Sequence, residues 1–215
     1  MSEDYTQLEG YNADADLGLG CGLPTKFANI KKGDTVVDLG SGAGNDCFIA
    51  RQEVGESGKV IGIDFTPQMI AKAEENAKKR GFDNIEFRIG DIEDMPVDDN
   101  WADVVVSNCV LNLLPHKDKI FHEIFRVLKP GGHFCISDIV INGELPPSLS
   151  EAVEMFVGCI AGAITKDEYI GEITKAGFKQ IEILKENNII LPDDLLSKYK
   201  SNDSVEAIES KSFEI

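Results

Sequence analysis

Three apolar stretches of this sequence lead into acidic residues, and side chains of this type at this spacing can hold a nucleoside. The first stretch, Val36 to Leu39, contains Asp38 and continues into glycines at alternate positions, Gly40, Gly42 and Gly44. Because glycine has no Cβ atom, the backbone there can turn sharply and approach a ligand closely. The pattern predicts a buried strand, a glycine-rich loop and the start of a helix whose first amides have no partner within the helix.

The spacing of the glycines indicates which ligand fits this loop. A dinucleotide fingerprint would place its third glycine at position 45, where a pyrophosphate packs against the helix. Asn45 stands there instead. The loop therefore favours a ligand without pyrophosphate, and a tight structural turn with no ligand is the alternative on this stretch alone.

Two further strand ends supply the remaining contacts of an adenosine. The apolar run 60–64 ends in Asp64, about twenty residues after the glycines, where a nucleoside-binding sheet places a carboxylate that accepts both ribose hydroxyls. A third run, 85–89, is followed by Asp91 and Ile92, which suit the amino edge and the face of an adenine. We expect the three strand ends to converge on one adenosine.

Cysteine is the other residue type that could do chemistry here. The five cysteines are odd in number and irregularly spaced: Cys21, Cys47, Cys109, Cys135 and Cys159. The start of the chain is acidic and polar, unlike a secretory signal, so we expect free thiols and no disulfide framework. The chain has no CxxC pair and only three histidines, which argues against zinc, so a site for a soft ion would have to combine distant cysteines.

Each cysteine also has a plain packing interpretation, because cysteine is among the most buried residue types. Cys47 lies in the first turn of a predicted helix, where the dipole can lower the pKa of a thiol, but core packing is favoured. Cys135 lies inside an apolar strand and is expected in the core. Cys21 stands in a glycine-rich loop, Cys109 at the end of the fourth predicted strand, and Cys159 on a segment that could cover that edge of the sheet.

Alternating helices and strands must position these side chains. They predict an α/β, Rossmann-like, doubly wound fold with a mostly parallel sheet and helices on both faces. Helices are expected at 25–31, 47–54, 67–80, 117–128, 149–163 and 169–176, strands at 36–39, 60–64, 85–89, 102–107, 134–140 and 180–187, and a turn at 129–132. We divide the chain into an acidic N-terminal arm (1–16), a single domain (17–192) and a charged C-terminal tail (193–215).

Composition narrows the classes of partner. The 215 residues carry a formal charge of -17, with 42% hydrophobic and 27% charged residues. That charge would repel phosphate backbones and anionic lipid surfaces, so neither nucleic acid nor membrane is expected as a partner. No apolar run is long enough to span a bilayer, and we expect a cytoplasmic protein that acts on a small molecule.

The motifs VVDLGSGAG, GIDFTPQMI, GDIEDMP and RVLKPGG resemble those of class I S-adenosylmethionine-dependent methyltransferases. Within that superfamily, LGLGCGLP, SGAGNDCFIA, VSNCVLNLLPHKDK and FVGCIAGA resemble the arsenite methyltransferases. The resemblance implies S-adenosylmethionine as cofactor, arsenite or its thiol conjugates as substrate, and a thiol reductant. It also implies that Cys21, Cys109 and Cys159 bind trivalent arsenic beside the methyl donor, with no resident metal.

The strand ends and the resemblance together imply a donor-binding set. Its members are Asp38, Gly40, Ser41, Gly42, Gly44, Asp64, Phe65, Met69, Asp91, Ile92 and Asn108. Two alternatives stay open: a methyltransferase of a small organic acceptor such as a quinone or amine, and a non-catalytic protein that binds arsenic.

The sequence departs from the family pattern at both ends. The family usually has a cysteine-bearing segment upstream of the Cys21 position and a further C-terminal domain. A shortened form or a fragment would explain the difference. The missing cysteine puts a disulfide relay with Cys47 in doubt, and the missing domain leaves open how many methyl groups are added.

Overall fold

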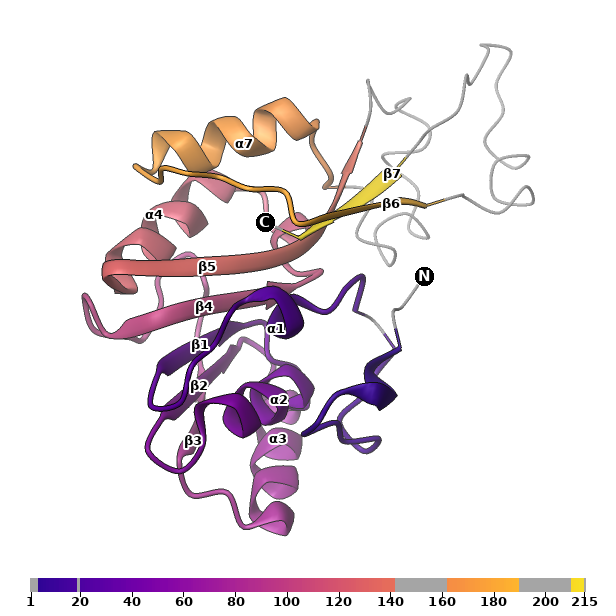
Figure 1. The fold of residues 1–215 in the computed structure, drawn as a ribbon, viewed down its shortest axis with the longest axis vertical. Helices are drawn as coiled ribbons and strands as arrows, with labels where there is room; N and C mark the ends of the chain where they lie inside the picture. The colour runs from indigo at the N-terminus through magenta and orange to yellow at the C-terminus, as the bar shows by residue number, and fades with distance from the viewer. Residues whose placement is uncertain (1–3, 19, 142–161, 190–209, 215) are drawn as a thin grey trace.

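A seven-stranded sheet organises the computed structural model, which describes residues 4–18, 20–141, 162–189 and 210–214 (Figure 1). The strand order is β3-β2-β1-β4-β5-β7-β6. The strands are β1 (Thr35–Leu39), β2 (Lys59–Asp64), β3 (Ile85–Ile89), β4 (Ala102–Asn108), β5 (Leu128–Ile141), β6 (Lys185–Ile189) and β7 (Ser210–Glu214). Strands β1 to β5 are parallel, and β7 is antiparallel to both β5 and β6. The predicted doubly wound α/β fold is confirmed.

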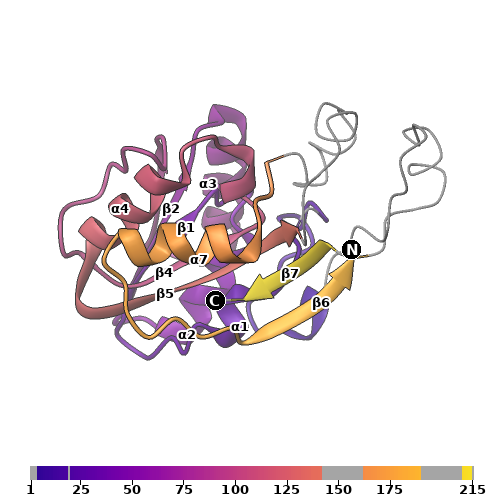
Figure 2. The same cartoon turned by 90° about the horizontal axis from the view of Figure 1, so that it is seen from above.

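Helices cover both faces of the sheet. They are α1 (Pro24–Phe27), α2 (Asn45–Val54), α3 (Pro67–Arg80), α4 (Lys117–Val127) and α7 (Lys166–Lys175), with 3-10 turns η1 (Tyr5–Gln7) and η2 (Leu111–Leu113). Helices α4 and α7 pack together on one face, and α1 and α2 lie on the other (Figure 2). Ala77 of α3 packs with Phe48 of α2, so α3 lies on the same face as α2. Within the described ranges, no helix is long and apolar enough to cross a membrane.

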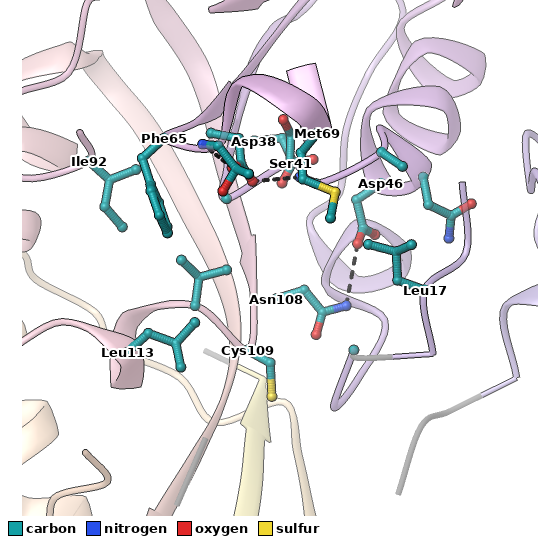
Figure 3. Close-up of a pocket in the computed structure, with 18 of the residues that line it drawn as sticks. Leu17, Asp38, Ser41, Asp46, Phe65, Met69, Ile92, Asn108, Cys109 and Leu113 are labelled. Carbon is teal, nitrogen blue, oxygen red and sulfur yellow. Dashed lines mark hydrogen bonds between the residues drawn. The ribbon is translucent and has the colours of Figure 1, made fainter. Parts of the chain in front are cut away.

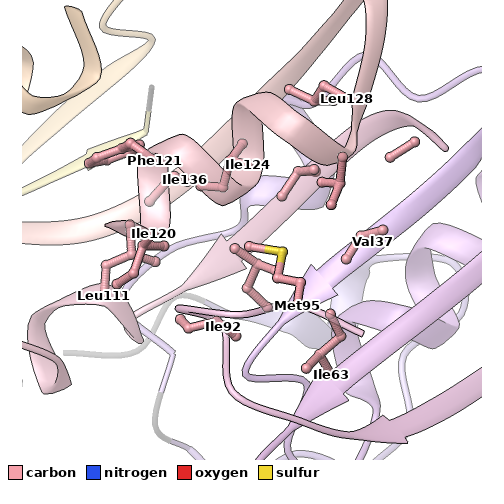
Figure 4. Close-up of a cluster of buried hydrophobic side chains, with 14 of the residues drawn as sticks. Val37, Ile63, Ile92, Met95, Leu111, Ile120, Phe121, Ile124, Leu128 and Ile136 are labelled. Carbon is pink, nitrogen blue, oxygen red and sulfur yellow. The ribbon is translucent and has the colours of Figure 1, made fainter. Parts of the chain in front are cut away.

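The larger hydrophobic core lies between the sheet and helix α4 (Figure 4). Ile120, Phe121 and Ile124 recur at helical spacing, so α4 turns one apolar face toward Val37 and Ile136 of the sheet. A second cluster fills the opposite face with residues of α1 and α2. Because the central strands are buried on both faces, they appear in the sequence as continuous apolar runs.

Local signals set the bounds of two helices. Helix α3 begins at Pro67, whose fixed φ suits a first helical position, and ends before Gly81, whose φ of 68° is the left-handed conformation common after helices. These bounds match the predicted 67–80. Helix α7 begins earlier than predicted because Thr165 and Glu168 form a capping box.

Three predicted elements are corrected. The helix expected at 25–31 ends at Phe27, and Asn29 has a left-handed φ of 47°. The strand expected at 180–187 begins only at Lys185: Gln180 has a φ of 61°, and Ile181 and Ile183 alternate because they pack against the core. The turn expected at 129–132 lies within β5. It is a shift in the pairing register, because Ala102 of β4 pairs with Leu128 and Val104 pairs with His133.

Two further segments, 149–163 and 193–215, lie wholly or partly outside the described residues. The helix expected at 149–163 lies almost wholly outside the described residues. The segment 193–215, whose structure the sequence left open, contributes the strand β7.

Candidate donor and thiol site

A cavity of about 790 Å³ opens at the carboxyl edge of the parallel strands, a volume typical of small-molecule sites (Figure 3). The register explains its place, because Leu39 lies beside both Ile63 and Ser107, so the ends of β1, β2 and β4 form one edge. Residues of the predicted donor set that line it are Asp38, Gly40, Ser41, Gly42, Asp64, Phe65, Met69, Asp91, Ile92 and Asn108.

The glycine loop forms the cavity wall after β1. Gly40 has a φ of 68°, and a Cβ there would overlap the side chain of Val110. The loop is held to β2 by a hydrogen bond from the Ser41 amide to the Ile63 carbonyl at 2.9 Å. Ser41 lines the cavity, but its hydroxyl is buried beneath the loop beside Gly62 of β2 and has no hydrogen-bond partner among the described residues.

Gly44 of the predicted set has a structural place. It is the N-cap of α2 with a φ of 96°, and it is absent from the cavity lining. A Cβ there would lie 2.9 Å from Phe48 and 3.0 Å from Phe87, so close packing of the helix on the sheet requires glycine.

Asp64 lies at the end of β2 and is almost fully buried. Its Oδ2 accepts a hydrogen bond from the Gly42 amide at 3.0 Å, and its Oδ1 accepts one from the Thr66 amide at 2.8 Å. Each carboxylate oxygen has two lone pairs, so each keeps one acceptor position beyond these two bonds. The carboxylate can therefore hold the glycine loop and accept two hydroxyl groups at once.

The other strand ends supply an apolar wall with one exposed acid. Ile92 is buried in the main core and also lines the cavity, whereas Phe65 is exposed at its rim. Asp91 is exposed, and its Oδ1 accepts a hydrogen bond from the Glu93 amide at 2.9 Å. Met69 of α3, a member of the predicted donor set, also lines the cavity.

Two acids with perturbed pKa values line the cavity: Asp38, which is buried, and Asp46, which is half-buried. Burial, and then the neighbouring Asp46, raise the pKa of Asp38 well above its usual range. Burial raises the pKa of Asp46 to about 6, although hydrogen bonds from Tyr5, Asn108 and Thr25 lower it. A cationic ligand in the cavity would face these acids and would favour their ionised forms.

Cys47 is wholly buried under the glycine loop. Its Sγ lies 3.2 Å from Asp38 Oδ2, to which it donates. Burial, and then the Asp38 charge, raise the pKa of the Cys47 thiol well above its usual range. The packing interpretation of Cys47 is therefore confirmed, and the alternative of a thiol activated by the helix dipole is wrong. Cys135 is likewise buried in the sheet, as expected.

Cys21 and Cys109 form a disulfide across 88 positions of sequence, with their Cα atoms 5.7 Å apart. Free thiols were predicted at both positions, and that prediction is wrong for this pair. The residues around each cysteine do not indicate the pairing. The two cysteines meet because the loop before α1 folds onto the end of β4. Both cysteines are buried, and Cys109 lines the cavity.

The third predicted arsenic ligand, Cys159, lies outside the described residues. Within the part of the chain that the structure describes, no cluster of three His, Cys, Asp or Glu side chains could hold a metal ion.

Sequence reasoning missed part of the lining. The N-terminal arm contributes Tyr5, Ala15 and Asp16, and the first turn of α2 contributes Asp46. The Tyr5 hydroxyl donates to Asp46 Oδ2 at 2.9 Å, which joins the arm to the helix. An acid just after the glycine loop was a visible signal for Asp46, whereas the arm has no periodicity that indicates where it packs.

The sheet order, the glycine loop after β1 and the acid after β2 define the class I methyltransferase fold. A family model described as a methyltransferase domain matches residues 30–177, and this chain belongs to that family. S-adenosylmethionine is the cofactor of this class of methyltransferase, and the cavity and the remaining acceptor positions of Asp64 fit it.

Relatives within the class narrow the similarity. An arsenite methyltransferase of Halobacterium salinarum is 50% identical over 182 residues, 81% of this chain and 46% of the relative. One of Aquipseudomonas alcaligenes is 36% identical over 186 residues, 83% of this chain and 53% of the relative. The chain thus spans about half the length of the curated relatives it matches.

A solved structure gives the same result. The crystal structure of an arsenic(III) S-adenosylmethionine methyltransferase from Chlamydomonas reinhardtii superposes with a TM-score of 0.80 at 33% identity, over 91% of this chain and 66% of that one. These similarities confirm the resemblance to arsenite methyltransferases that the sequence motifs indicated.

Proposed function

We propose that this chain transfers a methyl group from S-adenosylmethionine to trivalent arsenic held by Cys21, Cys109 and Cys159. The observation that carries the proposal is the meeting of Cys21 and Cys109 beside the cavity that Cys109 lines. Two cysteines so distant in sequence form a soft-ion site only if the fold brings them together, and here it does. The similarity to arsenite methyltransferases supports the same acceptor.

Arsenic binding would first require reduction of the Cys21–Cys109 disulfide. Two thiol groups of a small reductant would supply two electrons and two protons, leaving two cysteine thiols and an oxidised reductant. Arsenite, As(OH)3, would then react with three cysteine thiols: three As–S bonds form, and each hydroxide leaves as water with the proton of one thiol. The third thiolate would come from Cys159. A thiol reductant is therefore part of the proposed reaction.

The chemistry asks little of the protein beyond placement. Arsenic bound to three sulfurs keeps a lone pair, and soft thiolates suit a soft ion. The donor, when bound, supplies an electrophilic methyl group on a positively charged sulfur. The protein must therefore hold arsenic in line with that methyl and exclude water, and no general base is required.

Within the donor pocket we assign roles by position. The Asp64 carboxylate would accept the ribose hydroxyls, Asp91 and Ile92 would contact the adenine, and the glycine loop would contact the amino-acid end. The division into an arm at 1–16, a domain at 17–192 and a tail at 193–215, and a cytoplasmic location, remain predictions of the sequence.

Serine substitution of single cysteines tests the acceptor. Each of Cys21→Ser, Cys109→Ser and Cys159→Ser should abolish methylation of arsenite in the presence of S-adenosylmethionine and a thiol, while donor binding stays intact, because two sulfurs no longer fix the direction of the lone pair. Cys135→Ser is the matched control and should retain activity at some cost in stability. The measurements are arsenic stoichiometry and methylated arsenic in the product mixture.

The outcomes separate the three candidate functions. Full activity of Cys109→Ser or Cys159→Ser would refute the arsenic site and favour an organic acceptor such as a quinone or amine. Arsenic binding to the wild-type protein without any methylated product would favour a non-catalytic arsenic-binding protein.

A further inference from the structure

Asn108 connects the two cysteines that the fold brings together. It is the last residue of β4 and directly precedes Cys109. Its Oδ1 accepts hydrogen bonds from the amides of Cys21 at 3.0 Å and Gly22 at 3.3 Å, and its Nδ2 donates to the Gly22 carbonyl at 2.9 Å. The Asn108 side chain thus uses both its oxygen and its nitrogen to bind the backbone of the loop that carries Cys21.

A second set of contacts fixes the amide from the other side. Asn108 Nδ2 also donates to the Tyr5 hydroxyl and lies 3.3 Å from Asp46 Oδ2 (Figure 3). Tyr5 in turn donates to Asp46 Oδ2, and the Thr25 hydroxyl reaches Asp46 Oδ1 at 3.3 Å. Because its oxygen faces two donors and its nitrogen faces acceptors, the Asn108 amide has one satisfied orientation.

The backbone around this amide is closely constrained. A Cβ on Gly20 would lie 2.8 Å from Asn108 Nδ2, so the loop approaches this closely only with glycine at that position. Cys109 has a φ of 60°, an uncommon conformation for a residue with a side chain, and its amide donates to the Ser137 carbonyl at 2.8 Å. The direction of the Cys109 side chain is therefore set by the sheet, and that of Cys21 is set by Asn108.

We propose that Asn108 is a positioning residue of the arsenic site, and that Asp46 and Tyr5 hold its amide so that the thiols of Cys21 and Cys109 are adjacent before arsenic arrives. The inference rests on the proposed function, and it gives Asn108 a different role from the donor contact predicted from the sequence. A pair of ligands ordered in advance binds more tightly because the entropic cost of joining two segments is met during folding.

Asn108→Ala tests the role, and Asn84→Ala is the matched control. Asn84 makes the same kind of contacts near the opposite edge of the sheet: Oδ1 accepts from Arg51 Nε at 2.8 Å, and Nδ2 donates to the carbonyls of Gly55 and Gly58, both at 2.9 Å. Its loss should cost stability without reaching the cysteines. The two variants therefore separate a positioning effect from general destabilisation.

Three quantities are measured on each variant. They are the Kd of arsenite for the reduced protein, the Kd of S-adenosylmethionine, and the equilibrium between dithiol and Cys21–Cys109 disulfide in glutathione buffers, with the disulfide identified by peptide mapping. For Asn108→Ala we expect arsenite affinity and the disulfide equilibrium constant each to fall about tenfold, because both depend on the effective concentration of one thiol at the other. Donor affinity should change by less than about twofold, and Asn84→Ala should leave all three unchanged.

A side-chain swap adds a rescue. N108D alone sets two carboxylates against each other and removes the donor to Gly22, so both thiol measurements should fall. The double variant N108D/D46N restores one amide and one carboxylate across this contact and should recover part of the loss. Should Asn108→Ala fail to fold, Tyr5→Phe removes only one hydroxyl of the network and should shift both thiol measurements in the same direction by less.

Two results would overturn the inference. One is a weakened donor Kd in Asn108→Ala with both thiol measurements unchanged, which would make Asn108 a donor ligand. The other is an equal loss in Asn84→Ala, which would make the effect one of stability. If the wild-type protein binds no arsenite, the proposed function fails, and the disulfide equilibrium alone still decides whether Asn108 positions the two thiols.

Discussion

Replacing Asp64 by alanine should weaken binding of S-adenosylmethionine by roughly ten- to hundred-fold. The Asp64 carboxylate uses one acceptor position on each oxygen for the amides of Gly42 and Thr66, at 3.0 and 2.8 Å, and keeps one on each for the ribose hydroxyls. Hydrogen bonds to a charged acceptor contribute about 1.5 to 3 kcal/mol, which converts to that range of affinity. The Gly42 amide also loses its acceptor, which acts in the same direction by loosening the loop.

The assay is calorimetric titration of the donor into reduced protein, with urea unfolding of each variant to show that the fold is intact. Asp91→Ala is the comparison, because Asp91 is exposed and should contribute less, through the adenine edge alone. Asp64→Asn should lie between wild type and alanine, since it keeps one oxygen. An unchanged dissociation constant for Asp64→Ala, or an equal loss in Asp91→Ala, would refute the assignment of Asp64 to the ribose.

Two further predictions concern stability, measured by urea unfolding. Burial raises the pKa of Asp138 from 3.8 to about 7, although the nearby Lys117 and a hydrogen bond from Tyr169 lower it. The Asp138 carboxyl therefore binds its proton more tightly in the native state than in the unfolded chain. This contribution to stability is present at low pH and is lost as the pH rises through about 7, with a slope of up to about 1.4 kcal/mol per pH unit. Asp138→Asn should flatten that slope, and an unchanged slope would contradict the assignment. Gly62→Ala should destabilise the fold by about 1 to 3 kcal/mol, because a Cβ there would lie 2.7 Å from Cys47 Sγ. A loss below about 0.5 kcal/mol, the range of ordinary surface substitutions, would show that the helix and the strand have room to separate.

Short-range patterns predicted most of the sheet and part of the site. The positions of Asp64 and of the glycines at 40 and 42 could be predicted because each follows a buried apolar strand directly in the sequence. Parallel strands end at a common edge, so residues that follow them lie near one another. Helix 67–80 was predicted to the residue because proline and glycine both mark its ends. The strand 180–187 was misplaced because packing against a core produces the same alternation as pairing in a sheet.

Contacts between distant side chains could not be predicted in the same way. The network of Tyr5, Asp46 and Asn108 joins three segments through single hydrogen bonds, and no periodicity or composition indicates such contacts. The pairing of Cys21 with Cys109 has the same origin, since it depends on where the glycine-rich loop folds back.

Five acidic side chains line the cavity in which the donor is proposed to bind: Asp16, Asp38, Asp46, Asp64 and Asp91. A cavity with this lining attracts a sulfonium more strongly than the neutral thioether that remains once the methyl group has left, because the Coulomb attraction ends with the charge. The pocket thus discriminates by charge between cosubstrate and spent product, although the two differ by one methyl group. In the proposed reaction these acids would therefore favour exchange of the spent product for a new donor.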